Sequence, residues 1–371
     1  MNLSVLHINC NLAFTSLYFN LFRELSNIGV SQSVWVPYKK YHNPQIPETI
    51  EQVEYYFTGY QDVFDRILFH RKIHKGIKQF ESFDHRPSGS IIHAHTLFSD
   101  GALAYQINRK YGIPYVVTVR NTDLNVFWKY FPHLHYYGRR IARNASAITF
   151  LGPIYRDRMV KYLFPKTYDE VKDRVKVIPN GLDSFWLSHS PEVKKNSGPE
   201  IRILFVGGFT KNKNIKTVVQ ACTILIEKMG ENLTLRLVGA KKTPDFSYSE
   251  KNTWIETHPF CKSKEELAAH YRWADVFVMP SFAETFGLVY AEALSQGTPV
   301  IFTKGQGFDG WINEGACGYG VSPKNEHDIA RYITTLHQQH CEHECVKSSK
   351  HFSWQVIADR YLKIYENAVF C

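Results

Sequence analysis

A segment between residues 275 and 306 concentrates the side chains that could do chemistry. Its sequence, DVFVMPSFAETFGLVYAEALSQGTPVIFTKGQ, predicts a buried strand, a tight loop and a helix over Phe286–Ser295 that stops at Gly297. Glu284 lies at the helix entrance, and Glu292 follows on the same helix. Ligands of parallel sheets bind at this carboxyl edge, so the two carboxylates are placed to accept hydrogen bonds from hydroxyl groups.

The beginning of the same helix also offers backbone hydrogen-bond donors. The N–H groups of Phe286, Gly287 and Leu288 have no partner within the helix, and Thr285 precedes them. Such a helix start binds anions or hydroxyl oxygens. Gly287 leaves room for a ligand to approach the backbone closely.

A second loop carries positive charge. The predicted strand Ile201–Val206 runs into Gly207 and Gly208, and Lys211 and Lys213 follow before the next helix. A lone lysine in a loop is usually an ordinary surface residue. Its place between a glycine pair and a helix favours phosphate binding for Lys213.

Other patterns in the chain have more than one interpretation. Two glutamates eight residues apart are common on solvated helices, and only the strand–loop–helix context favours a functional role. The run Gly305-Gln-Gly-Phe-Asp-Gly310 matches the GxGxxG pattern of dehydrogenases. It follows a late strand and precedes no clear helix, which disfavours a dehydrogenase. These glycines are expected to let the backbone approach a ligand.

Two groups of potential metal ligands are interpreted as structural. His93 and His95 alternate onto one face of a predicted strand, as one packed histidine and one histidine facing a substrate. His337, Cys341 and Cys345 share a helical face if one helix spans them. Zinc sites usually draw ligands from more than one element, so no metal site and no cofactor are expected.

The elements that must position these residues form two α/β domains. Nearly continuous apolar strands alternate with amphipathic helices, which indicates parallel sheets covered on both faces. A polar stretch containing Pro and Gly, residues 185–200, is predicted to link the domains. The expected domains span residues 1–184 and 201–352, and two doubly wound sheets are expected to face each other across a cleft.

Composition is typical of a globular protein, with 44% hydrophobic and 21% charged residues among 371. No run approaches the roughly 20 apolar residues of a membrane-spanning helix, and the N-terminal segment reads as a buried strand rather than a secretory signal. The seven cysteines include no CxxC pair, which disfavours a disulfide framework. A cytoplasmic location is expected.

Positive charge is concentrated in the first half of the chain. Residues 1–183 contain 23 Lys and Arg against 15 Asp and Glu, whereas residues 184–371 contain 21 against 20. An anionic partner would therefore meet the first half, unless the charge only maintains solubility. No nucleic-acid-binding motif accompanies the charge, so nucleic acid is not expected as a partner.

The motifs together resemble glycosyltransferase family 4, whose members are retaining enzymes of the GT-B fold. The pattern PSxxETFGLVxxEALxxGxPVI within residues 280–301 resembles the donor-site segment of that family. Residues 177–183, VIPNGLD, resemble the end of its first domain, and Val206-Gly-Gly followed by Lys213 resembles its phosphate loop. Residues 92–95, IHAH, resemble a strand of its first domain.

The resemblance implies a role for each matching residue. Glu284 would hold hydroxyls of the donor sugar, Glu292 the nucleotide ribose, and Lys213 the donor pyrophosphate. Phe260 and Lys262 would line the base pocket. His95 and Arg120 stand where the first domain contributes to catalysis. The donor is expected to be a nucleotide sugar, UDP-sugars first among them, and the acceptor a glycan or a lipid-linked glycan in surface polysaccharide or glycoconjugate synthesis.

Three departures from the family pattern affect these roles. Gly208 stands where the family often has Arg, so that Lys211 is the candidate substitute. Arg120 stands where the family often has His at a strand end. The first turn, NCNLAFTS, lacks the usual paired glycines. A partner subunit that binds nucleotide sugars without catalysis is therefore the alternative.

Two expectations concern helices of the first domain. Residues 353–371 are amphipathic, and the resemblance implies that they pack back on the first domain. Between residues 66 and 80, basic and apolar residues interleave and predict an amphipathic helix. Its basic face could lie at an anionic membrane surface, or its apolar face could simply pack on the sheet. The basic residues are Arg66, Arg71, Lys72, Lys75 and Lys78, and Arg139, Arg140 and Arg143 add positive charge in the same domain.

Overall fold

The chain folds into two compact units in a computed structural model. It describes residues 3–12, 15, 17–41, 44, 49–66, 68–83, 88–191, 198–240 and 252–370. The first unit consists of Met1–Leu151, Tyr155–Gly181 and Trp354–Cys371, and the second of Gly152–Ile154 and Leu182–Ser353. The segment expected as a linker begins inside a short helix of the second unit, α6 (Ser184–Ser188), and its residues 192–197 lie outside the described part.

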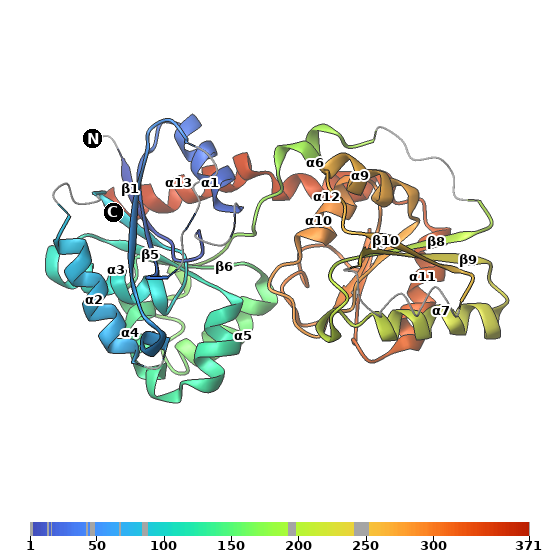
Figure 1. The fold of residues 1–371 in the computed structure, drawn as a ribbon, viewed down its shortest axis with the longest axis horizontal. Coiled ribbons are helices and arrows are strands. Elements are labelled where there is room, and N and C mark those ends of the chain that lie inside the picture. The colour runs from blue at the N-terminus through green and yellow to red at the C-terminus, as the bar shows by residue number, and fades with distance from the viewer. Residues whose placement is uncertain are drawn as a thin grey trace. The chain divides into compact units, whose positions relative to one another are not determined.

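The first unit is built on a seven-stranded parallel sheet in the order β3-β2-β1-β4-β5-β6-β7 (Figure 1). The strands are β1 (Ser4–Ile8), β2 (Ser31–Lys39), β3 (Val53–Gln61), β4 (Ile91–Ala94), β5 (Tyr115–Val119), β6 (Ala147–Phe150) and β7 (Val175–Val177). The connecting helices are α1 (Leu17–Asn27), α2 (Phe69–Glu81), α3 (Ser99–Tyr111), α4 (His135–Asn144) and α5 (Pro153–Leu163). Short turns are η1 (Val63–Arg66), η2 (Asp123–Trp128), η3 (Pro132–Leu134) and η4 (Lys172–Arg174).

Side-chain alternation along these strands produces two hydrophobic layers. Leu6, Ile92 and Val117 belong to one buried cluster with residues of α2, α3 and α4. Their neighbours Val5 and Ile91 face the opposite side, against α1 and the last helix of the chain. Both faces are covered because successive side chains of a strand point to opposite sides of a sheet.

The second unit repeats this architecture with six parallel strands in the order β10-β9-β8-β11-β12-β13. The strands are β8 (Ile201–Val206), β9 (Leu233–Ala240), β10 (Ile255–Pro259), β11 (Val276–Val278), β12 (Val300–Thr303) and β13 (Gly318–Val321). The helical elements are η5 (Lys211–Lys213), α7 (Ile215–Met229), α9 (Lys264–Trp273), α10 (Leu288–Ser295), α11 (Glu326–Gln338), α12 (Glu342–Ser349) and η7 (Lys350–Phe352). The predicted fold class, two doubly wound parallel sheets, is confirmed.

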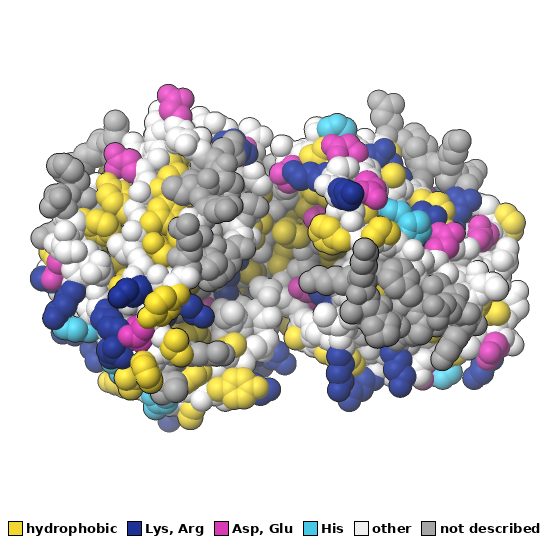
Figure 2. All heavy atoms as spheres, viewed as in Figure 1, with side chains coloured by type: hydrophobic (Ala, Val, Ile, Leu, Met, Phe, Trp, Pro, Cys, Tyr) yellow, Lys and Arg dark blue, Asp and Glu magenta, His cyan; other side chains and the backbone are white. Residues whose placement is uncertain are grey.

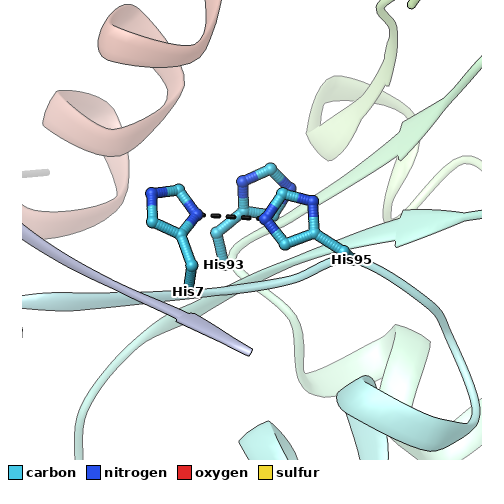
Figure 3. Close-up of side chains that lie close together, drawn as sticks. All are labelled: His7, His93 and His95. Atoms are coloured by element: carbon cyan, nitrogen blue, oxygen red, sulfur yellow. Dashed lines mark hydrogen bonds between the residues drawn. The ribbon is translucent and has the colours of Figure 1, made fainter. Parts of the chain in front are cut away.

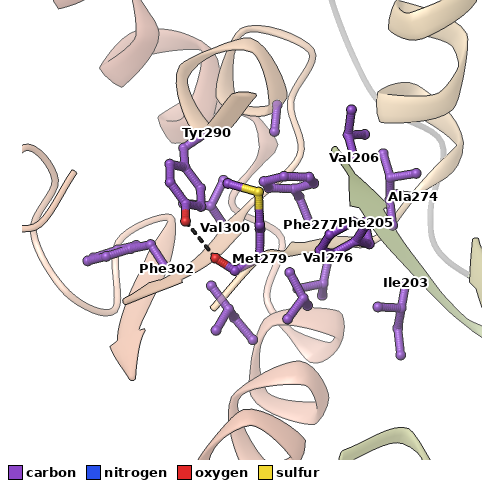
Figure 4. Close-up of a cluster of buried hydrophobic side chains, with 14 of the residues drawn as sticks. Ile203, Phe205, Val206, Ala274, Val276, Phe277, Met279, Tyr290, Val300 and Phe302 are labelled. Carbon is purple, nitrogen blue, oxygen red and sulfur yellow. Dashed lines mark hydrogen bonds between the residues drawn. The ribbon is translucent and has the colours of Figure 1, made fainter. Parts of the chain in front are cut away.

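Aromatic and aliphatic side chains lock β11 to α10 in the second unit. Figure 4 shows Phe277 and Met279 beside Tyr290, whose hydroxyl donates to the Met279 carbonyl oxygen at 2.6 Å. The Tyr290 and Phe277 rings meet edge to face, with centroids 5.7 Å apart. The loop between β11 and α10 is therefore anchored at both ends.

The last helix, α13 (Trp354–Phe370), returns to the first unit and packs against α1 (Figure 1). Trp354, Ile357, Tyr361 and Tyr365 are among its buried residues. Gly181 lies directly beneath Trp354, where a Cβ atom would come within 2.2 Å of the indole ring. No helix in the described part of the chain is long and apolar enough to cross a membrane.

Some elements differ from the sequence-based expectations. Strands β3 and β13 were not predicted, because aromatic and polar residues alternate irregularly in VEYYFTGYQ and glycine fills half of GYGV. Helix α10 begins at Leu288 rather than Phe286, since Gly287 adopts φ +78° immediately before it.

Candidate functional site

The strand order of the second unit places two loops side by side at the carboxyl edge of its sheet. β8 pairs with β9 on one side and with β11 on the other, so the order reverses between β8 and β11. The loop after β8 carries Lys213, and the loop after β11 carries Glu284. Ligands of open α/β sheets bind outside the strand ends at such a reversal.

Lys213 and Glu284 form an ion pair at this position. The Lys213 Nζ lies 2.5 Å from the Glu284 Oε2, and the two side chains are 26% and 15% exposed. An ammonium group has three N–H donors and a carboxylate has two oxygens, so each group keeps hydrogen-bonding capacity for a ligand. The pair thus presents positive charge and a hydroxyl acceptor at one place.

Two asparagines hold the two loops together. The Asn212 Nδ2 donates to the Ala283 carbonyl oxygen at 2.9 Å, and the Asn212 Oδ1 accepts from the Ala283 N–H at 3.1 Å. Asn214, at φ +60°, donates through Nδ2 to the Pro280 carbonyl oxygen at 3.0 Å. The sequence resemblance to the phosphate loop includes Asn214, but neither asparagine was given a role from the sequence. The signal was present, because Asn tolerates this backbone conformation and commonly precedes a helix.

The glycines of the loop after β8 serve close packing. Gly207 has φ +151°, and its N–H donates to the Val238 carbonyl oxygen at 2.9 Å. A Cβ on Gly239 would lie 2.6 Å from the Gly207 carbonyl oxygen. Gly208 and Lys211 are exposed. Lys211 lines a pocket of about 440 Å³ whose lining residues do not include Lys213 or Glu284.

The segment between Glu284 and α10 is fixed by the glycine run of residues 305–310. The Glu284 N–H donates to the Gln306 Oε1 at 3.1 Å, and the Gly307 N–H donates to the Glu284 carbonyl oxygen at 3.2 Å. A Cβ on Gly307 would come within 1.7 Å of the Thr285 carbonyl oxygen. Gly307 thus supports the Glu284 loop directly. The need for close packing explains why this position is glycine.

Phe286 is predicted to offer its backbone N–H to a ligand. Its side chain is buried and packs edge to face on Phe308, Trp311 and Phe352. Its contribution to a ligand is therefore limited to the backbone. Leu288, the first residue of α10, begins a helix whose first N–H groups lack intrahelical partners.

Glu292 lies on α10 and faces α9. Its Oε2 accepts a hydrogen bond from the Tyr271 hydroxyl at 3.0 Å. Burial raises the pKa of Glu292 to about 7, although the Tyr271 hydrogen bond and the nearby Lys264 charge oppose that rise. The carboxyl group consequently changes its charge near neutral pH. Sequence reasoning did not foresee the Tyr271 contact.

Phe260 and Lys262 follow the edge strand β10. The Phe260 side chain is 77% exposed, and Lys262 is also exposed. The Lys262 N–H donates to the Glu266 Oε2 at 2.9 Å. An exposed aromatic ring at the carboxyl end of a strand is available for stacking on a flat ligand.

Three histidines are buried together at the centre of the first unit (Figure 3). The His7 Nδ1 and the His95 Nε2 are 3.0 Å apart, and His93 stacks on His95 with ring centroids 4.1 Å apart. Burial lowers the pKa of His7 to about 3 and lowers the pKa values of His93 and His95 well below 6.5. All three imidazoles are therefore neutral, and His95 belongs to the interior rather than to an open substrate surface.

This histidine cluster is poorly arranged to hold a metal ion. The two nitrogens of His93 already contact the Tyr365 hydroxyl at 2.7 Å and the Thr118 Oγ1 at 2.9 Å. One ligand atom of each histidine lies within 4.8 Å of the others, but the His7 Nδ1 and the His95 Nε2 also contact each other at 3.0 Å, so these nitrogens already have partners.

The other candidate metal group is divided between helices. α11 ends at Gln338 and α12 begins at Glu342, so the single helical face expected for His337, Cys341 and Cys345 does not exist. The predicted shared face is therefore wrong.

Arg120 is held rigidly at the carboxyl end of β5. Its Nε donates to the His95 carbonyl oxygen at 3.1 Å, its Nη1 donates to the Asn180 Oδ1 at 3.1 Å, and its guanidinium lies over the Tyr18 ring at 5.0 Å. Asp123 orders the same turn by accepting from the backbone N–H groups of residues 97, 98 and 120. Arg120 is thus a cation held in a fixed orientation. Its Nε and Nη1 make these two hydrogen bonds, and its Nη2 takes part in neither.

The amphipathic helix α2 packs its apolar face on the sheet. Phe69, Ile73 and Phe80 are buried, and Lys72 points inward to the Ser99 Oγ at 2.8 Å. The remaining basic face is partly neutralised, because Asp62 lies 2.9 Å from Arg71 and 2.7 Å from Lys75. A uniformly basic helix face for a membrane is therefore absent from the described side chains of α2.

Comparison with known proteins shows one family across the chain. Residues 17–184 match the model of Glycosyltransferase Family 4, and residues 189–352 match the model of Glycosyl transferases group 1. A D-inositol 3-phosphate glycosyltransferase from Paenarthrobacter aurescens is 29% identical over 75% of this chain and 72% of its own length.

An alpha-monoglucosyldiacylglycerol synthase from Streptococcus pneumoniae is 28% identical over 66% of this chain and 58% of its own length. The structure of a sucrose-phosphate synthase from Thermosynechococcus elongatus superposes with a TM-score of 0.75 and 18% identity, over 98% of both chains. With two doubly wound sheets, the two family models and these relatives in agreement, the chain belongs to the family-4 glycosyltransferases of the GT-B fold.

Proposed function

We propose that the protein transfers a sugar, with retention of the anomeric configuration, from a nucleotide sugar to a glycan or lipid-linked acceptor. UDP-sugars are the first donors to test, and surface polysaccharide or glycoconjugate synthesis in the cytosol is the proposed setting. The observation that carries the proposal is the Lys213–Glu284 pair at 2.5 Å, at the strand-order reversal of the second unit.

In this proposal the second unit binds the donor. Lys213 contacts the pyrophosphate, where negative charge grows as the sugar–phosphate bond breaks. A fixed cation in a partly desolvated site stabilises such charge effectively. Glu284 accepts hydrogen bonds from sugar hydroxyls, Glu292 from the ribose, and the exposed Phe260 ring stacks on the base with Lys262 beside it.

The proposed reaction needs no metal ion. The bond between the anomeric carbon and the phosphate oxygen breaks, and a bond to the acceptor oxygen forms on the same face of the sugar. The acceptor hydroxyl proton passes to the departing phosphate oxygen. Lys213 and the amides at the start of α10 serve as the electrophilic groups. We therefore expect undiminished turnover in a chelator, and full loss restored by manganese would contradict the mechanism.

The first unit is proposed to bind the acceptor. Arg120 is fixed by His95, Asn180 and Tyr18, and its remaining N–H groups can hold an acceptor oxygen without a further loss of side-chain entropy. His95 acts through this contact as a positioning residue, because its ring is buried.

A lipid-linked acceptor implies contact with a membrane. The S. pneumoniae relative is named as the synthase of a glucosylated diacylglycerol, which makes a lipid acceptor worth testing. Hydrophobic side chains lie among charged ones over the α2 and α4 side of the first unit in Figure 2. Val63 and Phe64 are 77% and 67% exposed beside α2. We propose peripheral contact through these apolar side chains rather than through the basic face of α2, and Phe64→Glu should abolish sedimentation with anionic vesicles.

A donor screen followed by a transfer assay tests the function. UDP-, GDP-, ADP- and TDP-sugars are compared by thermal shift, where a ligand at a hundred times its dissociation constant adds about 2.7 kcal/mol of stability. The stabilising donor is then assayed for sugar release and transfer. Stabilisation without turnover would instead identify a non-catalytic partner subunit that binds nucleotide sugars, and no stabilisation by any donor would contradict both functions.

A further inference from the structure

The segment from α3 to β6 holds an excess of positive charge, of which the transferase chemistry uses only Arg120. Residues 101–150 include seven Lys and Arg residues and one acidic residue, Asp123. The Asp123 carboxylate is buried and satisfied by backbone N–H groups. The surface of this segment therefore has few acidic groups to compensate its cations.

Part of this charge converges on one pocket of the first unit. The pocket has a volume of about 560 Å³ and lies between α4 and the segment that follows α5. Its cationic lining comes from Arg139, Arg140, Arg143 and Lys166. The lining includes no carboxylate, and the ion pairs found in the described part of the chain involve none of these four residues. Four like charges in one cavity repel each other unless an anion joins them.

The three guanidinium groups are held in place by neutral partners. The Arg139 Nε donates to the Tyr162 carbonyl oxygen at 3.0 Å, the Arg140 Nη2 to the Tyr105 hydroxyl at 2.8 Å, and the Arg143 Nη2 to the Thr167 Oγ1 at 3.1 Å. Each arginine has five N–H donors, so these single contacts orient the group and leave most donors free.

Aromatic rings fix the arginines further. Arg139 lies over the Trp128 ring at 5.7 Å, and Arg140 lies over Tyr105 at 5.7 Å and Tyr136 at 6.0 Å. A guanidinium that is already immobilised loses little entropy when an anion binds. Two of the arginines are thus oriented by aromatic rings in addition to their hydrogen bonds.

We propose that this pocket binds a phosphate ester. A phosphate monoester has three terminal oxygens, so it can accept hydrogen bonds from several guanidinium groups at once. A carboxylate has only two oxygens. The cavity is much larger than a bare phosphate ion and falls in the range of organic-ligand pockets. Tyr136, Leu163 and Pro165 supply an apolar wall for the rest of the ligand.

The pocket is separate from the carboxyl edge of the first sheet. α4 and α5 both follow strands that end at that edge. The pocket is lined by α4 from Tyr136 to its end at Asn144, and by Leu163 at the end of α5 with the residues after it. Those helix ends lead back to the amino edge of the parallel sheet. Arg120 and His95 lie at the carboxyl ends of β5 and β4, so the pocket is a second binding site rather than an extension of the acceptor site.

Calorimetric titration with sn-glycerol 3-phosphate tests the proposal. Phosphate groups would also occupy the donor site, so the titrations use protein that carries Lys213→Ala. The variant Arg143→Gln/Lys166→Gln removes two exposed pocket cations, and the control Arg109→Gln/Lys161→Gln removes two exposed cations elsewhere in the same unit. Circular dichroism confirms the fold of each protein. A single Arg140→Gln variant provides a second test.

Saturable binding should weaken about tenfold or more in the pocket variants, because each lost charged hydrogen bond costs about that factor. It should stay within about twofold in the control. Absence of saturable binding would overturn the proposal, as would an equal loss in the control. Glucuronate binding as tightly as glycerol phosphate would also overturn it, since the site would then be selective only for charge.

Vesicle flotation distinguishes the two sources of the phosphate ester. Flotation with phosphatidylcholine vesicles containing phosphatidic acid, whose phosphate is a monoester, lost in Arg143→Gln/Lys166→Gln and kept in the control, would identify a lipid headgroup. Binding of glycerol phosphate without this pocket-dependent flotation would identify a soluble phosphate ester. Both outcomes support the phosphate site.

Discussion

Lys213 has a partner before any ligand arrives, and this affects what a ligand must do. A free lysine side chain carries about 2 kcal/mol of rotamer entropy, part of which the Glu284 contact has already removed. An incoming pyrophosphate therefore meets a cation that is already in place. Until a ligand binds, the Glu284 carboxylate neutralises the charge of Lys213, so no separate counter-ion is required at the site.

Lys213→Ala should lower turnover by about 100- to 1,000-fold, because it removes a preorganised group from a site of developing charge. The fold should be retained, since a partly exposed ion pair contributes only about 0–1 kcal/mol. Steady-state kinetics and thermal unfolding check the two halves of this prediction. Retention of more than about a third of wild-type turnover would contradict the phosphate role.

Glu292→Gln should weaken nucleotide binding and remove its pH dependence near neutrality. Burial raises the pKa of Glu292 from 4.5 to about 7, so the folded state binds a proton more tightly than the unfolded state. Stability then falls as pH rises from 4.5 to 7, and the ionised form that accepts ribose hydroxyls predominates above pH 7. Urea unfolding and nucleotide titration at pH 5.5 and 8 measure both effects. An identical pH dependence in wild type and Glu292→Gln would contradict this role.

At the scale of elements, loops joined to each other position the site. The loop after β8 and the loop after β11 exchange hydrogen bonds through Asn212, and the glycine run after β12 supports the same Glu284 backbone. Each loop thereby restricts the others. This arrangement accounts for the short, glycine-rich spacing between strand ends and helices.

Gly287→Ala should destabilise the second unit and disturb the start of α10. A Cβ atom would be forced into φ +78° and would lie 2.4 Å from the Tyr290 ring. Overpacking of this kind costs about 1–3 kcal/mol in addition to about 1 kcal/mol for the backbone conformation. Gly230→Ala is the control, because it has φ +67° with open space around its Cβ position. Equal unfolding free energies for the two variants would show that the Tyr290 contact is unimportant.

The sequence predicted most strands and both sheets because continuous apolar runs between helices have few alternative structures. It also placed Glu284 and Lys213 each in a loop that follows a strand, but the pairing of those two strands, β8 and β11, came only from the structure. It could not predict that Lys72 points inward to Ser99, because the face of a helix that meets the sheet depends on distant packing partners. The Tyr271–Glu292 contact was equally hidden, since it joins two helices whose relative rotation is set by the core.

On the scale of the whole chain, α13 ties the end of the sequence to the first sheet. Its Tyr365 hydroxyl contacts the buried His93 Nδ1 at 2.7 Å, although the two residues are 272 positions apart. His93 would otherwise have a buried polar atom without a partner. The helix therefore supplies a polar contact as well as an apolar cover.

Tyr365→Phe should lower the free energy of unfolding of the first unit by about 1–3 kcal/mol, because it leaves a buried His93 nitrogen unpaired. Tyr361→Phe, on the same helix, is the matched control and should change stability by less than about 0.5 kcal/mol. Denaturant unfolding followed by aromatic fluorescence compares them. Similar losses in both variants would contradict a specific contribution from the hydrogen bond between Tyr365 and His93.

The return of α13 to the first unit also determines the order in which the protein can be completed during synthesis. The second unit ends at Ser353, whereas the first needs Trp354 and the residues after it. Domains usually fold in the order in which they leave the ribosome. Here the unit that begins first is completed after the second, because its sheet stays uncovered on the α13 face until α13 emerges. For that interval the nascent chain carries a finished second unit and an exposed apolar surface on the first, the kind of surface that makes folding intermediates prone to aggregation.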